Sequence, residues 1–346
     1  FLMNHQRETF SSSQPLILKS GTALESFNLI YDTYGRINKE KDNIILIFHA
    51  FSGSHHAAGK LDHDESSGWW DSFIGPNKVF DTNKNYIICI NNIGSCFGST
   101  GPFSLNKSTN KPYGEDFPEI SVSDWNQAIL FLLYSLNIKT ISVAVGSSLG
   151  GMQVMDLISN KDINVKKGII IGATHKPRQL NILFNHVQRS ILKLNKSSDA
   201  LKVARMLSHI SYISNDFLQD RFQYNIESPE TKISNDIVYE SENYLSYHGE
   251  KFTKKFNKDS FVLMTKAMDS FYFDESKIDN ISSKVLLLSF DDDLLFPSED
   301  MIKFHELLKV KGVKSKHKNL KGTRGHDSFL HLTKEYKDEL EKFINN

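Results

Sequence analysis

Six short apolar segments, separated by stretches with helical periodicity, constrain the fold of this 346-residue chain more than any other feature. Each segment is a near-continuous series of Ile, Val and Leu bounded by turn residues. Such series are typical of strands buried on both faces, as in a parallel sheet covered by helices. They span residues 43–49, 85–91, 139–146, 167–172, 284–290 and, more weakly, 313–320. The alternation predicts a doubly wound α/β fold, preceded by a hairpin within 15–34.

The helical segments fall into two groups. Residues 123–136, 298–310 and 333–344 have the apolar spacing of helices that cover a sheet. Between about 175 and 280 the alternation stops, and helical patterns follow one another at 178–192, 199–212, 215–222, 240–256 and 260–271. An all-helical block placed there predicts a cap over the carboxyl ends of the strands, although it could instead complete the core. We therefore expect a core of residues 1–174 and 281–346 and a helical cap of residues 175–280.

Composition excludes several classes of protein. Lys plus Arg and Asp plus Glu both number 41, so the chain lacks the basic excess typical of a nucleic-acid binder. Two cysteines, Cys89 and Cys96, cannot supply a disulfide framework or a multi-cysteine metal site, and we expect free thiols. No apolar run approaches the roughly 20 residues of a membrane helix, and residues 1–15 lack the apolar centre of a signal peptide. A soluble cytoplasmic protein is the expectation.

A strand, a tight turn and a helix surround the sharpest local motif. Residues 143–146 are an apolar strand that leads into Gly-Ser-Ser-Leu-Gly, and a helical pattern begins at Met152. This context is the one that a nucleophile elbow requires, with Ser148 at its apex. Ser147 is the competing hydroxyl, which we expect to support the turn. A glycine-rich turn without chemistry is the alternative.

A nucleophilic serine needs a histidine base, and the base needs an orienting carboxylate. In this arrangement the chain order is serine, acid, histidine. Three consecutive aspartates, residues 291–293, follow the strand at 284–290, and periodicity does not choose among them. His326 lies in a glycine-containing loop after the last predicted strand. For an oxyanion hole we expect the backbone N–H groups of Leu149 and of Phe51, which follows the strand at 43–49.

Taken together, the motifs resemble the homoserine O-acetyltransferase family, acyltransferases of methionine biosynthesis with an α/β-hydrolase fold. The resemblance covers nearly the whole chain. It is carried by residues 49–55 (HAFSGSH), 68–71 (GWWD), 74–76 (IGP), 81–82 (DT), 91–102 (NNIGSCFGSTGP), 113–118 (YGEDFP), 146–153 (GSSLGGMQ), 184–189 (FNHVQR), 204–212 (ARMLSHISY), 293–297 (DLLFP) and 325–330 (GHDSFL).

The resemblance implies a role for each matching residue. It makes Ser148 the nucleophile, Asp293 the orienting acid and His326 the base. Arg205 and Asp327 match the positions that hold the carboxylate and the amine of the amino-acid substrate. It further implies L-homoserine and acetyl-CoA as substrates, no metal or bound cofactor, and a homodimer. Without the resemblance, Arg205 reads as a surface arginine and Asp327 as a helix N-cap.

The chain departs from the family pattern near the expected acyl site, at Phe51, Ser52, Ser95, Ser147 and Leu149. These departures leave the acyl donor open. Transfer from succinyl-CoA or to serine would use the same mechanism, and a carboxylesterase or thioesterase would use water as acceptor. A non-catalytic binding scaffold is a further alternative, which the intact triad disfavours. Transfer of an acetyl group to homoserine is the function that we expect.

Overall fold

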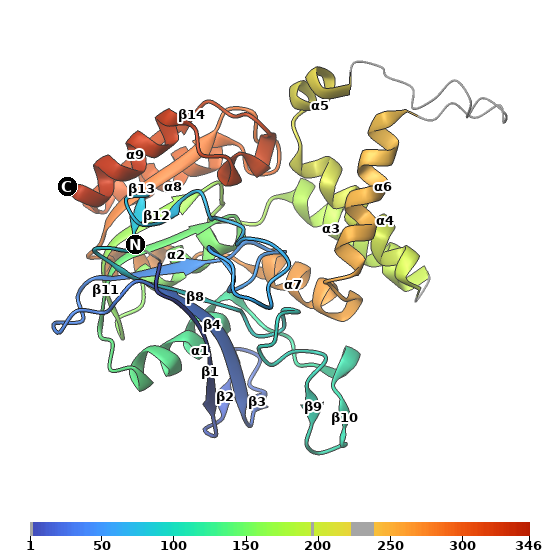
Figure 1. The fold of residues 1–346 in the computed structure, drawn as a ribbon, viewed down its shortest axis with the longest axis horizontal. Helices are drawn as coiled ribbons and strands as arrows, with labels where there is room; N and C mark the ends of the chain where they lie inside the picture. The colour runs from blue at the N-terminus through green and yellow to red at the C-terminus, as the bar shows by residue number, and fades with distance from the viewer. Residues whose placement is uncertain (1–2, 195–196, 223–238) are drawn as a thin grey trace.

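The computed structural model describes residues 3–194, 197–222 and 239–346, and its centre is an eight-stranded sheet (Figure 1). From one edge to the other the strands are β1 (His5–Ser12), β4 (Phe27–Tyr34), β8 (Tyr86–Ile90), β5 (Ile44–Phe48), β11 (Thr140–Ser147), β12 (Asn164–Ile171), β13 (Lys284–Phe290) and β14 (Ser315–Leu320). β4 runs antiparallel to both neighbours, and all pairings from β8 to β14 are parallel. The expected mostly parallel sheet is confirmed.

The six predicted strands correspond to β5, β8, β11, β12, β13 and β14, with ends that differ by a few residues. The expected hairpin is only partly present. A small ladder, β2 (Leu16–Ile17) with β3 (Ala23–Leu24), does surround the turn at Gly21. The longer strand β4 pairs instead with β1, an N-terminal strand that the sequence analysis did not predict. The shorter pairs are β6 (Ile74–Gly75) with β7 (Phe80–Asp81) and β9 (Leu105–Asn106) with β10 (Lys111–Pro112).

Helices and loops cover both faces of the sheet. Neighbouring residues of a strand point to opposite faces, and in the central strands both sets are apolar and need to be buried. In β5, Ile44 and Leu46 join a core with α1 (Val122–Ser135), α2 (Leu149–Ile158) and α8 (Ser298–Val310). Ile45 and Ile47 join a second core on the opposite face. That second core is completed by α9 (Lys334–Asn345) and by the loops around Trp70 and Phe73.

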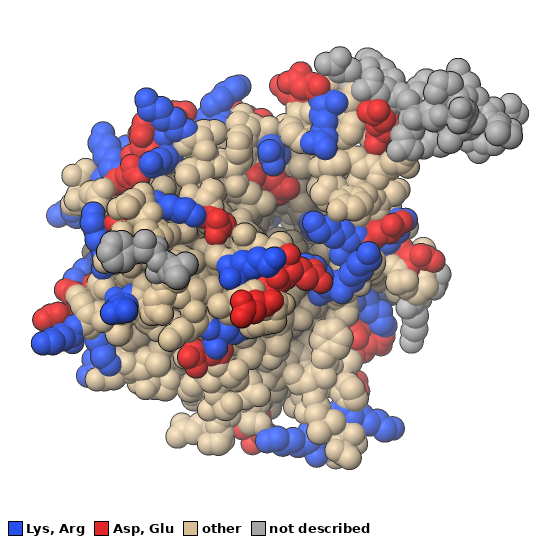
Figure 2. All heavy atoms as spheres, viewed as in Figure 1, with Lys and Arg blue, Asp and Glu red and all other residues tan. Residues whose placement is uncertain are grey.

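Among the described residues, five α-helices lie between β12 and β13 in the chain and stand at one end of the sheet (Figure 1). They are α3 (Gln179–Leu194), α4 (Ser198–Tyr212), α5 (Asn215–Phe222), α6 (Glu240–Thr253) and α7 (Lys258–Ser270). All five predicted helices are confirmed, and α4 packs against both α3 and α6. None of the helices in the described ranges is long and apolar enough to cross a membrane. Figure 2 shows acidic and basic side chains interspersed over the visible face of the molecule.

Candidate active site

Ser148 occupies a sharp turn between β11, which ends at Ser147, and α2, which begins at Leu149. Its backbone has φ 55° and ψ −123°, a conformation that side-chain-bearing residues rarely adopt. The turn is held because the Ser148 N–H donates to the carbonyl of Ile171, at 2.9 Å. A Cβ at Gly146 would collide with the carbonyl oxygen of Gly150, so the motif needs a glycine there. The predicted strand–turn–helix context of a nucleophile elbow is therefore present.

The geometry distinguishes the three aspartates. Asp293 Oδ2 accepts a hydrogen bond from His326 Nδ1 at 2.8 Å, and both residues are buried. Asp293 Oδ1 accepts from the backbone N–H groups of Leu295 and Phe296, each at 2.9 Å, which fixes the carboxylate. Asp293 is thus the aspartate that meets the predicted base.

The other two aspartates bind the backbone of the loop that carries His326. Asp292 accepts from the N–H of Gly325 at 2.8 Å, and Asp291 accepts from the N–H of Gly322 at 2.7 Å.

Burial lowers the pKa of His326, but the charge of Asp293 and its hydrogen bond outweigh burial, so the pKa is raised overall. Among the described residues, no hydrogen bond joins Ser148 Oγ to His326 Nε2; such contacts often tighten only when substrate binds.

Ser148 and His326 open onto a pocket of about 150 Å³. Phe51, Arg205 and Asp327 line the same pocket, so five of the seven residues selected from the sequence meet there. The other two, Asp293 and Leu149, lie buried behind it. The remaining lining residues are Ala50, Ser52, Gly53, Trp69, Tyr212, Met268, Leu295, Phe329 and Leu330.

Arg205, on α4, is not a surface arginine. Its guanidinium lies 4.6 Å from the ring centroid of Phe252 and 5.2 Å from that of Tyr212. The Arg205 Nη1 atom is buried and has no hydrogen-bond partner. A buried guanidinium nitrogen without a partner is costly, and an anionic ligand in the pocket would satisfy it.

Asp327 lies inside a 3₁₀ turn, Gly325–Leu330, whose N-cap is Arg324, so Asp327 is not the cap. Burial raises the pKa of Asp327, although nearby positive charges, including Arg205, act in the opposite direction. No ion pair joins Asp327 to Arg205 in the part of the chain that the structure describes. A positive and a negative side chain therefore line one pocket without neutralising each other by direct contact.

The loop that carries Phe51 is held at its start by residues that the sequence analysis did not select. His49 is fully buried, and burial lowers its pKa to about 4, so the imidazole is neutral. Its Nδ1 donates to the carbonyl of Ala50 at 2.8 Å, and its Nε2 accepts from the N–H of Asn92 at 3.0 Å. The side-chain amides of Asn92 and Gln153 donate to each other, which ties this loop to α2.

Two further features differ from expectation or add to it. The Ser147 hydroxyl is buried without a hydrogen-bond partner, so it does not support the turn as expected. Tyr212, which the sequence analysis placed only at the end of a helix, lines the pocket between Arg205 and His326. The one sequence signal that could have pointed to Tyr212 is its place in residues 204–212, a segment that matches the family.

Comparisons with known proteins identify the fold and the family of this chain. A family model described as the alpha/beta hydrolase fold matches residues 43–330. The homoserine O-acetyltransferase of Methanococcus vannielii is 36% identical over 347 aligned positions, which cover 94% of this chain and 70% of the relative. The homoserine O-succinyltransferase of Halothiobacillus neapolitanus is 35% identical over 362 positions, which cover 98% and 89%.

A solved structure shares the fold across the whole chain. The homoserine O-acetyltransferase of Bacillus anthracis has a TM-score of 0.90 at 24% identity, with 99% of this chain and 98% of that chain covered. The sequence relatives, each covered over more than two thirds of its length, establish the relationship more closely than the fold does. The chain belongs to the homoserine O-acyltransferase family of α/β hydrolases.

Proposed function

We propose that this chain transfers an acetyl group from acetyl-CoA to the hydroxyl of L-homoserine in two steps. The observation that carries the proposal is the placement of Arg205 and Asp327 in one pocket with Ser148 and His326. A guanidinium binds a carboxylate through two parallel hydrogen bonds, and a carboxylate binds an ammonium. The two side chains therefore suit the two charged groups of a free amino acid.

In the first step the Ser148 hydroxyl attacks the thioester carbonyl of the acyl donor, and His326 accepts the serine proton. The N–H groups of Phe51 and Leu149 stabilise the oxyanion. The C–S bond then breaks, and His326 gives its proton to the leaving thiolate. Asp293 orients the imidazole and stabilises its charged form, through the 2.8 Å hydrogen bond.

In the second step homoserine enters with its carboxylate at Arg205 and its ammonium at Asp327. His326 removes the proton of the homoserine hydroxyl, whose oxygen attacks the acyl-enzyme. The ester bond to Ser148 breaks, and His326 returns the proton to the serine. Each step uses only groups that line the pocket, together with the buried Asp293 and the backbone N–H of the buried Leu149, and we propose no metal or bound cofactor.

The acyl donor is the finer part of the proposal. A succinyl group, unlike an acetyl group, carries a free carboxylate at its far end. That carboxylate would need a cation near the acyl site, in addition to the one that binds the carboxylate of homoserine. Of the described residues that line the pocket, Arg205 alone is an arginine or lysine, and the carboxylate of the acceptor would occupy it. The apolar rings around Phe51, those of Phe256 and Phe261, suit a small neutral acyl group. This favours acetyl-CoA, although relatives of both kinds are known.

Two properties of the whole molecule complete the proposal. We infer a cytoplasmic enzyme, since Cys89 and Cys96 are both free. We also infer a homodimer through the cap, residues 175–280. Leu183 and Val187 on α3 are 58% and 47% exposed, one helical turn apart, which a second copy could cover. Leu192, a further apolar residue of α3, is buried and does not belong to this exposed surface.

An assay of CoA release tests the function. The enzyme is given acetyl-CoA or succinyl-CoA, each with homoserine, serine or no acceptor. We expect fast release only with acetyl-CoA and homoserine together, and one equivalent of release without acceptor. Equal steady release without any amino acid would identify a thioesterase. Preference for succinyl-CoA would reverse the choice of donor and leave the mechanism unchanged.

A further inference from the structure

Two side chains of β4, Asp32 and Tyr34, face the far end of the loop that carries Phe51. They are two residues apart on one strand, so they point to the same face of the sheet. Both are completely buried, although one is charged and the other has a polar hydroxyl. We call residues 50–58 the oxyanion loop, because the proposed function gives Phe51 a role in the oxyanion hole.

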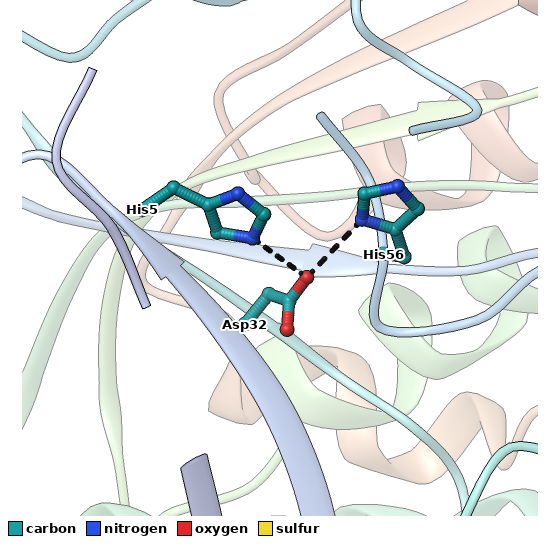
Figure 3. Close-up of side chains that lie close together, drawn as sticks. All are labelled: His5, Asp32 and His56. Atoms are coloured by element: carbon teal, nitrogen blue, oxygen red, sulfur yellow. Dashed lines mark hydrogen bonds and ion pairs between the residues drawn. The ribbon is translucent and has the colours of Figure 1, made fainter. Parts of the chain in front are cut away.

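Asp32 is the centre of a buried polar cluster. Its carboxylate accepts two hydrogen bonds from Arg7, at 2.8 and 2.9 Å, and one from His5 at 2.9 Å, both on β1. It also accepts one from His56 of the oxyanion loop at 3.3 Å (Figure 3). Burial alone would raise the pKa of Asp32, but the hydrogen bonds from His5, His56 and Arg7 lower it far below its ordinary value. The carboxylate is therefore ionised at neutral pH.

Tyr34 holds the next two residues of the loop. Its hydroxyl oxygen accepts from the backbone N–H groups of Ala57 and Ala58, at 2.9 and 3.0 Å. Its own proton is directed to Asp32 Oδ2, at 3.4 Å. The two anchors are thus connected to each other. The Tyr34 hydroxyl is the partner of the buried Ala58 N–H, whereas the Ala57 N–H also donates to the His55 carbonyl at 2.9 Å.

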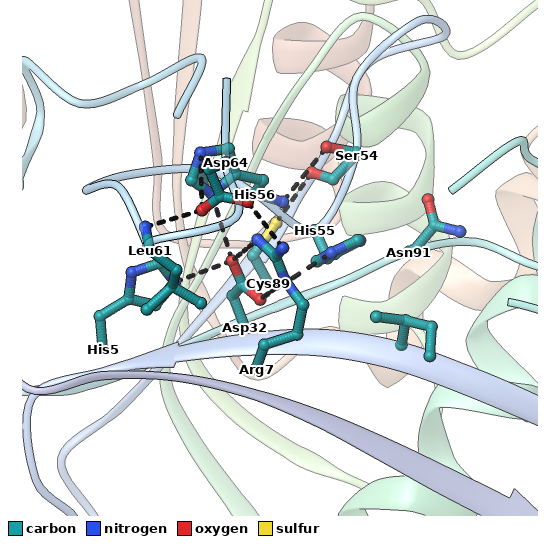
Figure 4. Close-up of polar contacts among 12 residues, drawn as sticks. His5, Arg7, Asp32, Ser54, His55, His56, Leu61, Asp64, Cys89 and Asn91 are labelled. Carbon is teal, nitrogen blue, oxygen red and sulfur yellow. Dashed lines mark hydrogen bonds and ion pairs between the residues drawn. The ribbon is translucent and has the colours of Figure 1, made fainter. Parts of the chain in front are cut away.

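Few residues separate these anchors from Phe51. The Trp69 indole N–H donates to the Ser54 carbonyl at 2.9 Å, and the Cys89 thiol also lies against this carbonyl (Figure 4). The Gly53 N–H donates to the Ala50 carbonyl at 2.9 Å and closes the turn around Phe51. A displacement of the backbone at residue 56 is therefore transmitted to Phe51, because the segment between them is short and is held by hydrogen bonds at each end.

Donor atoms of His5, Asp32 and His56 lie within 4.8 Å of one another, as the ligands of a metal ion would. The guanidinium of Arg7 already occupies both oxygens of this carboxylate. A divalent cation would be placed beside that positive charge, at high electrostatic cost. The cluster fits a structural anchor better than a cation site.

We propose that Asp32 and Tyr34 are positioning residues, which hold the oxyanion loop so that the Phe51 N–H reaches the oxygen of the reacting acyl group. This inference rests on the proposed function, and specifically on Phe51 as an oxyanion donor. Because the same N–H acts in both steps, a misplaced loop slows acylation and deacylation by a similar factor. Binding of the acceptor at Arg205 and Asp327 is separate from it.

The test uses rate constants per titrated active site in the full-length enzyme. Tyr34→Phe removes only the hydroxyl, and His56→Ala removes the hydrogen bond that the loop donates to Asp32 while the neighbouring His55, 3.9 Å from Asp32, stays in place. We expect each to slow the acylation burst and the deacylation step by about 10- to 100-fold, as a displacement of about 1 Å can do. The homoserine concentration for half-maximal deacylation stays within twofold. His56→Asn places an amide N–H where His56 Nδ1 lies, so it recovers most of the rate.

His63→Ala is the matched control, since His63 follows the oxyanion loop in the chain and contacts Arg7 but not Asp32. We expect its rate constants to equal those of the wild type. Lower melting temperatures of Tyr34→Phe and His56→Ala with unchanged rate constants would overturn the inference, as would no difference between His56→Ala and His56→Asn. Should Tyr34→Phe not fold, the two His56 variants decide. A wild-type enzyme without an acylation burst would instead refute the proposed function.

Discussion

His326 Nδ1 lies 2.8 Å from Asp293 Oδ2. The neighbouring Asp291 and Asp292 accept hydrogen bonds from the backbone of the loop that carries His326, and Asp291 also pairs with Lys321. Three consecutive carboxylates thus have two different tasks. One accepts a hydrogen bond from the imidazole, and the other two accept hydrogen bonds from the backbone of the loop.

Asp293→Asn is expected to reduce turnover by roughly 10⁴-fold, because the imidazole loses the charge that stabilises its protonated form and sets its tautomer. Asp291→Asn and Asp292→Asn keep the hydrogen bond between His326 and Asp293, so each should reduce turnover by less than about tenfold. Steady-state kinetics of the three variants, with circular dichroism to confirm folding, make the comparison. Greatest sensitivity at Asp291 or Asp292 would contradict the assignment.

The two adjacent serines give a second comparison. Ser148→Ala should fold normally and form no acyl-enzyme, since the hydroxyl at the turn apex is gone. Ser147→Gly should keep most of the activity, because the Ser147 hydroxyl makes no hydrogen bond. Intact-protein mass spectrometry after mixing with acetyl-CoA, without homoserine, detects the adduct. An adduct on Ser148→Ala would remove Ser148 from the proposed role.

Arg205→Ala separates acceptor binding from catalysis. Acylation of Ser148 should proceed at a near-normal rate, because Arg205 takes part only when homoserine binds. Deacylation should need roughly 10- to 150-fold more homoserine, which corresponds to the loss of a charge-assisted contact of about 1.5–3 kcal/mol. Arg205→Lys should recover only part, because an ammonium does not reproduce the planar guanidinium.

Rapid-mixing measurement of the burst, followed by a homoserine titration, tests this expectation. Asp327→Asn should behave similarly through the acceptor's ammonium, with an added effect on its neighbour His326. Loss of the burst in a folded Arg205→Ala variant would assign Arg205 to the acyl donor or to the cap, and the acceptor site would then lie elsewhere.

The pH dependence of acylation follows from the raised pKa of His326. His326 must be neutral to accept the serine proton, so the rate falls as pH drops through its pKa. Because Asp293 raises that pKa, the acidic limb of kcat/KM for the acyl donor should lie above the ordinary histidine value of about 6.5. Asp293→Asn should shift the limb to lower pH. A limb that stays in place in this variant would show that another group controls it.

The sequence by itself determined the features that depend on neighbouring residues. The strand–turn–helix around Ser148 was predictable, because the glycines and the apolar strand that create it are adjacent in the chain. The buried strands β5, β8, β11, β12 and β13 were predictable for the same reason, since their residues are apolar on both faces. The edge strand β1 was missed, because its exposed polar residues give it no such pattern.

Only the tertiary structure decided which distant side chains meet. Periodicity left residues 291–293 equivalent, and the family resemblance chose Asp293, but its contact with His326 spans 33 positions of sequence. Neither Asp32 nor Tyr34 was selected at all, because a buried aspartate in a strand has no local signature. Its partners, Arg7 and His56, come from segments that pack together only when the sheet forms. Local patterns report local geometry, whereas charge pairing and burial depend on the fold that brings remote residues together.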